Sequence, residues 1–343
     1  MPQPDRRISP GGWVLVTGAN GYIASHVVDI LLDQGYNVRG TVRNEKLWLN
    51  RYFETKYGKG GFQTFILPDL EDQSAFDKAV NGVSGVVHIA TDVSFSTDVH
   101  AVVAKVVAGT VNVLQSAAKE PSVKSVVLTS SSSAALIPVP NQEGVVVDQN
   151  TWNDAAVKAA YSGAAPAEQL PFLSYAASKT EGEHAFWDWV KTNNPSFAVN
   201  SVLPNMAMGP IPSPEMYGST MGFIRELLEG KTDKNIDMFP PQWYIDVRDI
   251  ARVHVAALLD PTVQSERLFA FAGPFNWNDI IRILKKLRPG NTNIPAAPEN
   301  EGRDLSDVWK ASKRAEELIR SFFGVKGWIS LEESLEAGIV DLK

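Results

Sequence analysis

The residues best suited to move a proton are Tyr175 and Lys179, which lie four positions apart where a helical pattern begins. That spacing places both side chains on one face of a helix. A phenol has an ordinary pKa of about 10, too high for easy proton exchange near neutrality, but a nearby ammonium favours the phenolate. The pair therefore suits acid–base chemistry, although the same spacing arises by chance in many proteins.

A run of hydroxyl side chains, Thr129–Ser133, follows an apolar segment that is typical of a buried strand. A serine at such a strand end can hydrogen-bond both a substrate oxygen and the tyrosine. Alternatively, every hydroxyl in the run only terminates the strand and satisfies the turn. Spacing alone does not choose among them.

Near the N-terminus, an apolar run at residues 13–17 turns at a glycine and becomes a helical pattern. Unpaired N–H groups at such a helix start can bind a pyrophosphate where glycine leaves the backbone bare. The spacing is Gly-x-x-Gly-x-x-Ala, ending at Ala24, and departs from the commoner Gly-x-Gly-x-x-Gly. The alternative is a turn that binds nothing. The contacts that we predict for a dinucleotide are Gly18, Ala19, Asn20, Gly21, Tyr22 and Ile23.

The next expected strand, residues 37–43, ends in Val42 and Arg43, with Arg39 and Lys46 close by. NAD-preferring sites carry an acidic residue at this place, which holds the adenosine ribose. A guanidinium instead matches the geometry of an additional 2′-phosphate. We therefore predict NADP or NADPH rather than NAD, the alternative being solvated surface charges.

Two further strand ends carry candidate cofactor contacts. Asp69 and Leu70 follow the expected strand at residues 62–67, where a carboxylate can accept from the adenine amino group. An N-cap for a helix over Gln73–Val80 explains Asp69 equally well. Ala90 and Thr91 lie at the end of the next apolar strand, where ligands bind in open α/β sheets.

The alternation of strands and helices predicts a doubly wound parallel sheet, a Rossmann-type α/β fold, with a smaller substrate-capping lobe built from insertions and the C-terminal region. Residues 1–204 are expected to form mainly the dinucleotide-binding domain, with a lid-like insertion around 138–173. Residues 205–343 are expected to form mainly the lobe, with 244–272 returning to the first domain and 205–214 in a loop.

Composition narrows the function classes. The 343 residues are 44% hydrophobic and 21% charged, as in ordinary soluble globular proteins, and the net charge is −7. A nucleic-acid partner would need a basic face. The N-terminal segment has no apolar run long enough for a signal peptide, and the run at residues 13–17 is too short to span a membrane. The chain has no cysteine, which excludes disulfides and thiolate chemistry, and we expect no metal site. The expected compartment is the cytoplasm.

Five motifs in this order resemble the extended short-chain dehydrogenase/reductase family, in its dihydroflavonol-reductase-like branch. The chain is most similar there to fungal NADPH-dependent aldehyde and ketone reductases. The resemblance covers nearly the whole chain, including Pro240–Tyr244 and Trp328–Ser334. The motifs are Thr17–Ala24, Val38–Arg43, Leu128–Ser131, Tyr175–Lys179 and Pro204–Pro210.

The resemblance implies a role for each matching residue. Ser131 would be the catalytic serine, Tyr175 the proton donor, and Lys179 the residue that holds the nicotinamide ribose and lowers the tyrosine pKa. Pro204 would lie beside the nicotinamide carboxamide. Relatives often have an asparagine three positions before Gly109 that feeds a proton relay, whereas this chain has Val106 there.

The expected activity is reduction of a small carbonyl substrate by NADPH, carried out by a monomer or homodimer in an apolar pocket. One alternative is a nucleotide-sugar epimerase or dehydratase, which keeps NAD bound, and another is a non-catalytic NADP-sensing regulator. The candidate residues of the substrate pocket, each of which could equally be core of the lobe, are Phe95, Phe172, Met206, Phe239, Gln242 and Trp243.

Overall fold

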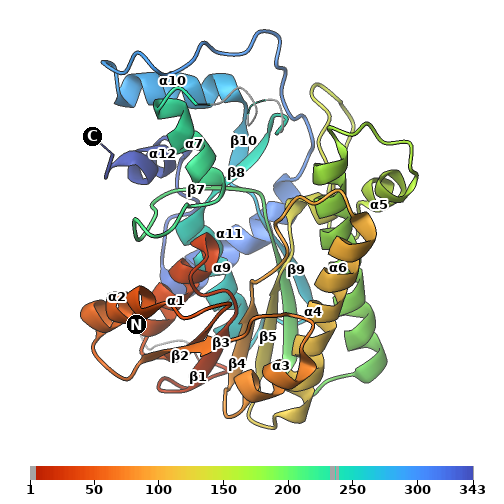
Figure 1. Ribbon diagram of the computed structural model, residues 1–343, viewed down its shortest axis with the longest axis vertical. Coiled ribbons are helices and arrows are strands. Elements are labelled where there is room, and N and C mark those ends of the chain that lie inside the picture. The colour runs from red at the N-terminus through yellow and green to blue at the C-terminus, as the bar shows by residue number, and fades with distance from the viewer. Residues whose placement is uncertain (1–4, 232–235, 237–238, 343) are drawn as a thin grey trace.

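The computed structural model describes residues 5–231, 236 and 239–342, and its main element is a seven-stranded sheet (Figure 1). All neighbouring strands in it are parallel. This confirms the predicted Rossmann-like α/β fold. The strand order is β3 (Phe62–Ile66), β2 (Asn37–Val42), β1 (Trp13–Val16), β4 (Gly85–His88), β5 (Ser125–Thr129), β6 (Ala198–Pro204) and β9 (Glu266–Ala270).

Helices cover both faces of the sheet because its strands are apolar on both sides. Leu15, Val86 and Val126 pack in one cluster with Phe76, Leu114 and Phe186. Their sequence neighbours belong to the cluster on the opposite face. One face carries α3 (Gln73–Val80), α4 (Val99–Lys119) and α6 (Leu170–Asn193), and the other carries α1 (Tyr22–Asp33), α9 (Val247–Leu259) and α11 (Trp309–Phe323) (Figure 1).

A smaller lobe lies at one end of the large sheet (Figure 1). Its three-stranded sheet has the order β10 (Gly273–Phe275), β8 (Gln242–Asp246) and β7 (Met206–Met208). Its helices are α7 (Thr220–Leu228), α10 (Trp277–Leu287) and α12 (Leu331–Ile339).

Three sequence expectations need correction. Residues 206–208 were expected in a loop, but they form β7, since the short run Met206–Met208 pairs with β8. The return to the large sheet begins with α9 at Val247 rather than at residue 244, because β8 stays paired within the lobe. The lid region contains a helix, α5 (Asp154–Tyr161), and α6 already begins at Leu170. A further helix, α2 (Leu47–Tyr57), was not predicted.

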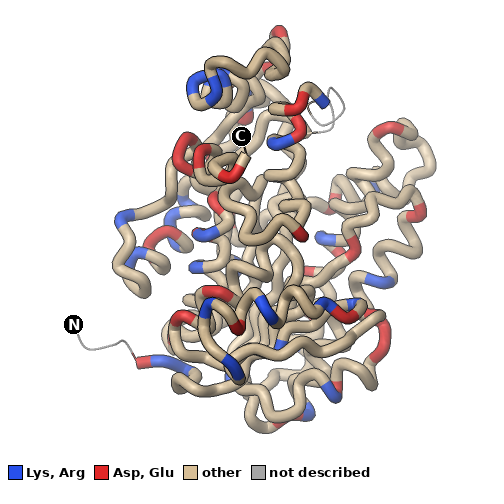
Figure 2. The backbone as a smooth tube through the Cα atoms, turned by 60° about the vertical axis from the view of Figure 1, so that its left-hand side comes forward, with Lys and Arg blue, Asp and Glu red and all other residues tan. Residues whose placement is uncertain are grey.

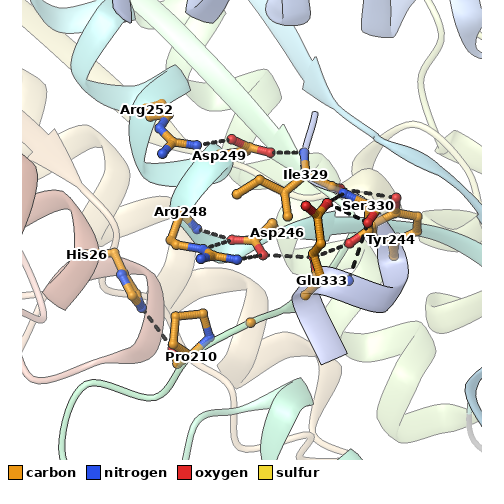
Figure 3. Close-up of polar contacts among 12 residues, drawn as sticks. His26, Pro210, Tyr244, Asp246, Arg248, Asp249, Arg252, Ile329, Ser330 and Glu333 are labelled. Atoms are coloured by element: carbon orange, nitrogen blue, oxygen red, sulfur yellow. Dashed lines mark hydrogen bonds and ion pairs between the residues drawn. The ribbon is translucent and has the colours of Figure 1, made fainter. Parts of the chain in front are cut away.

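Buried polar contacts fasten the lobe to the helices of the large sheet (Figure 3). Asp246, at the end of β8, accepts hydrogen bonds from the backbone and guanidinium of Arg248 and from the Ser334 hydroxyl of α12. His26 of α1 contacts the Pro210 carbonyl at 3.0 Å. Asp249 binds Arg252 and the backbone N–H of Ile329 at 2.6 and 2.7 Å. The lobe is thus held in a defined position over the first helix.

Among the described helices, α4 is long and apolar enough to cross a membrane, but half of its most apolar window is buried. It packs between α3 and α6, as the core helix of a soluble protein does. On the surface, acidic and basic residues are interspersed over the view that Figure 2 presents.

Candidate active site

A cavity of about 640 Å³ runs between the carboxyl ends of the large sheet and the lobe, a size suited to a small-molecule ligand. It brings together most of the residues that the sequence singled out. The predicted residues on its wall are Gly18, Asn20, Gly21, Tyr22, Ile23, Arg43, Lys46, Leu70, Ala90, Thr91, Phe95, Ser131, Phe172, Tyr175, Lys179, Pro204, Met206, Phe239 and Gln242.

The glycine turn fits a dinucleotide pyrophosphate. Gly18 has φ +69°, and a Cβ there would lie 3.2 Å from the Cβ of Ala90, so a larger residue would strain the turn. Gly21 is the N-cap of α1 and has no side chain to accept from the helix N–H groups. The first-turn N–H groups therefore stay available to an anion at the positive end of the helix. Ala19 lies beneath this turn, fully buried and off the cavity wall.

Tyr22 lines the cavity at the first turn of α1, but its hydroxyl points into the lobe. It donates to the Gly209 carbonyl at 2.8 Å. Burial raises the pKa of this phenol well above its ordinary value. Tyr22 therefore joins α1 to the lobe and does not exchange protons near neutrality.

The basic residues of β2 and of the segment after it lie in two different places. Arg43 is exposed at the cavity edge, with Asn44 and Lys46 beside it. Arg39 instead donates to the carbonyls of Ala79 and Asn81 at 2.7 and 2.8 Å and lies off the cavity wall. It lies within the strand, four residues before Arg43, and its side chain is directed toward the end of α3. The expectation that Arg39 contacts the cofactor is corrected accordingly.

At the adenosine end, Leu70 lines the cavity but Asp69 does not. The Asp69 carboxylate accepts from the backbone N–H of Glu71 at 3.0 Å and stabilises the turn before α3. The N-cap of α3 is Asp72, which accepts from Ala75. Neither sequence-based interpretation of Asp69 therefore describes its place in the fold.

Tyr175 and Lys179 both face the cavity from α6, but they do not contact each other directly. Lys179 is buried, and its ammonium donates to the Thr129 carbonyl at 2.8 Å. Burial raises the pKa of Tyr175, and a hydrogen bond from Ser131 lowers it in part. This corrects the expectation that Lys179 lowers the pKa of Tyr175 in this structure. The phenol is neutral and can donate its proton.

Ser131 is the serine of the hydroxyl run that the geometry favours as a donor into the cavity. Its Oγ accepts from the Ser133 hydroxyl at 2.9 Å and from the Ser133 backbone N–H at 3.2 Å. A hydroxyl oxygen has two lone pairs, so both are used and its own proton is directed elsewhere. Ser130 points away from the cavity, toward Glu183 at 2.8 Å. Asn153, at the start of α5, holds the Ser133 carbonyl at 2.8 Å.

Aromatic rings enclose the end of the cavity around Tyr175. Phe95 lies 5.2 Å and Phe172 lies 6.3 Å from the Tyr175 ring, measured between centroids. Phe239 packs against Phe172 and stacks on Phe223. Phe95 has φ +51°, an uncommon backbone conformation for a bulky residue that often accompanies ligand sites.

Trp243 does not belong to this end of the cavity. Gln242 and Trp243 are neighbours on β8, so their side chains point to opposite faces. Gln242 lines the cavity, whereas Trp243 is 2% exposed and packs on Trp309 with centroids 4.5 Å apart. The expectation that both residues line the pocket is therefore wrong for Trp243, which is buried where β8 packs against α11 and the large sheet.

Val106, at the position where relatives often have the relay asparagine, packs against the neighbouring helix α6. Val106 lies against Gly182 of α6, where a Cβ would come within 2.9 Å of its methyl group. It also borders a small cavity of about 10 Å³ behind Lys179. No side-chain polar atom replaces the asparagine at this position.

The wall includes residues that the sequence reasoning did not select. Thr41 accepts from the Gly18 backbone N–H at 3.0 Å and so shapes the glycine turn. Phe223 comes from α7, an element without a motif, and only packing of the lobe brings it to the cavity. Ser133 belongs to the hydroxyl run that the sequence singled out, but spacing alone could not show which of these hydroxyls reach the cavity.

Known proteins match this chain over nearly its full length. The family described as "NAD dependent epimerase/dehydratase family" matches residues 14–269. Ketoreductase adrE of Penicillium rubens is 46% identical, covering 97% of each chain. Aldehyde reductase 2 of Sporidiobolus salmonicolor is 41% identical, covering 98% of each. Yeast methylglyoxal/isovaleraldehyde reductase Gre2, solved with NADPH, superposes with a TM-score of 0.75 at 25% identity, covering 96% of this chain and 97% of Gre2.

Proposed function

Because the chain belongs to the NAD-dependent epimerase/dehydratase family, we propose that it is an NADPH-dependent reductase of ketones and aldehydes. The resemblance to extended short-chain dehydrogenases/reductases is confirmed, and relatives named as ketoreductase and aldehyde reductase align over almost the whole chain. The observation that carries the proposal is the meeting of Ser131, Tyr175 and Lys179 on the wall of one cavity with the glycine turn.

Each residue has a separate task in the reaction. NADPH, when bound, supplies the hydride that reduces the carbonyl carbon. Ser131 donates a hydrogen bond that orients the carbonyl oxygen, and Tyr175 gives that oxygen its proton. Lys179 binds the nicotinamide ribose and carries a positive charge beside the reacting groups. At the far end, Arg43 and Lys46 bind the 2′-phosphate.

The direct test is consumption of NADPH with a panel of neutral ketones and aldehydes, followed by chiral analysis of the alcohols. Equimolar loss of NADPH and carbonyl supports the proposal. A tightly held cofactor that is never consumed would instead indicate an epimerase or dehydratase. Binding without turnover of any carbonyl would indicate a sensing protein.

The chemistry of the substrate end predicts a preference for uncharged carbonyl compounds. Its wall is formed by Phe95, Phe172, Phe223 and Phe239, while Arg43 and Lys46 lie at the adenosine end. An anionic substrate would lose its hydration against these rings, which costs several kcal/mol. We expect kcat/KM for a 2-oxo ester to exceed that for the matching 2-oxo acid by about 100-fold or more. Equal values for the two compounds would contradict this substrate class.

Ser133 is expected to matter through its bond to Ser131. Ser133→Ala removes one of the two donors to the Ser131 Oγ, so the Ser131 proton is directed less well. We expect kcat to fall by about fivefold to tenfold, in line with the loss of one hydrogen bond. Ser133→Thr, which keeps the hydroxyl, serves as the control and should retain most activity. NADPH affinity, measured by fluorescence titration, should be the same in both variants.

We also propose that the enzyme works in the cytoplasm as a monomer or homodimer. Light scattering coupled to size-exclusion chromatography separates the two assemblies by mass. A higher-order complex would contradict the proposal.

A further inference from the structure

Behind the catalytic residues, a buried carboxylate is surrounded by donors. Glu183 of α6 is 1% exposed. Its two oxygens accept from Ser130 at 2.8 Å, Ser201 at 2.6 Å and the Trp187 ring at 3.3 Å. Arg267 of β9 adds two bonds at 2.9 and 3.1 Å. Five hydrogen bonds therefore hold this carboxylate in one orientation.

Arg267 extends this network to the lid segment before α5. The same guanidinium donates to the carbonyls of Gln149 and Thr151 at 2.8 and 2.9 Å. It lies 3.7 Å from the centroid of the Trp152 ring, which stacks on the ring of His184 at 3.9 Å. One arginine therefore joins β9, the lid segment and the catalytic helix.

Glu183 lies on the same face of α6 as Tyr175 and Lys179. Tyr175, Lys179 and Glu183 follow one another at four-residue intervals and so lie along one face of α6. Lys179 binds the carbonyl of Thr129, and Glu183 binds the hydroxyl of the next residue, Ser130. Two successive turns of α6 thus hold the last residue of β5 and the residue that follows it, directly before Ser131.

We propose that Glu183 and Arg267 are positioning residues for the reduction: the Glu183 carboxylate is the counter-charge of Lys179, and the pair holds the Ser131 strand end against α6. This inference rests on the proposed reductase function. Neither residue belongs to the sequence motifs described above. Neither side chain lines the large cavity, so both act through Ser131 and Lys179.

The charged and titratable groups around Lys179 determine whether its side chain is protonated near neutral pH. Burial lowers the pKa of Lys179 to about 8, and the Glu183 carboxylate opposes that shift. His88 of β4, on the other side, is buried with its pKa lowered to about 3, so it is neutral. Tyr175 on the same helix is also neutral, and Arg267 lies beyond Glu183. Within the described residues, Glu183 is the anion that keeps Lys179 protonated near neutral pH.

The decisive experiment is the pH profile of kcat for Glu183→Gln. Without the carboxylate the pKa of Lys179 falls, so we expect the alkaline limb of the profile to move to lower pH by about one unit. We also expect kcat at its optimum to fall by about tenfold. In Arg267→Gln the carboxylate loses its other partner, so the limb should stay or move to higher pH. A limb that moves down in both variants, or in neither, overturns the proposal.

Two further variants separate positioning from simple loss of stability. Asp249→Asn breaks another ion pair of a buried carboxylate, that with Arg252 within α9, and should lower the melting temperature without moving the limb. Glu183→Asp keeps the charge on a shorter side chain, so kcat should fall while the limb stays. If Glu183→Gln does not fold, a displaced limb in Glu183→Asp overturns the proposal and an undisplaced limb with lowered kcat supports it.

The wild-type enzyme separates this inference from the function on which it rests. If the wild type reduces no carbonyl compound, the proposed function fails. If it is active and Glu183→Gln keeps the wild-type profile, only the positioning role fails.

Discussion

Replacing Tyr175 with phenylalanine is expected to lower kcat by about 100-fold to 10,000-fold, the range in which a positioned general acid contributes. The phenol is neutral because burial raises its pKa, and it is placed between Ser131 and the aromatic end of the cavity. The ring packing against Phe95 and Phe172 survives the change, so the cavity keeps its shape. NADPH consumption with a neutral ketone measures the loss.

NADPH affinity should change by less than about threefold in this variant, because losing one hydrogen bond removes little binding energy. Tyr161→Phe is the matched control. That tyrosine is 41% exposed on α5, and its replacement should leave kcat unchanged. Full turnover by Tyr175→Phe would refute the assignment of this residue as proton donor.

The double variant Arg43→Ala, Lys46→Ala is expected to raise KM for NADPH by about 100-fold and to leave KM for NADH almost unchanged. Both side chains lie at the adenosine end of the cavity, after β2. A charge-assisted hydrogen bond contributes about 1.5–3 kcal/mol, and only NADPH carries the phosphate that receives it. The ratio of kcat/KM for the two cofactors, measured with one ketone, reports the effect.

Arg39→Ala provides a control from the same strand. Arg39 binds the Ala79 and Asn81 carbonyls and not the cavity, so its loss should reduce stability without changing the preference for NADPH over NADH. If Arg39→Ala changes the preference as strongly as the double variant does, our assignment of the phosphate site is wrong.

The order of strands and helices in the large sheet was predictable from local pattern. The apolar run at residues 85–90 and the helical periodicity of Trp277–Leu287 are properties of consecutive residues. The structure has the helix at these bounds, and its strand β4 ends two residues earlier than predicted, at His88. The lobe was less predictable. Strands β7, β8 and β10 contain three to five residues each, too few for a periodic pattern, and they pair only because distant segments meet.

By itself, the sequence determined the fold class, the glycine turn and the spacing of Tyr175 and Lys179, because each depends on residues close together in the chain. Only the tertiary structure decided which candidates share the cavity. It directed Arg39 toward α3, buried Trp243 between β8 and α11 and used Ser133 to direct Ser131. It also joined Glu183 to Arg267 across 84 positions of sequence. These contacts depend on which face of a strand or helix packs against another element. The spacing of residues that are close together in the sequence does not determine that packing.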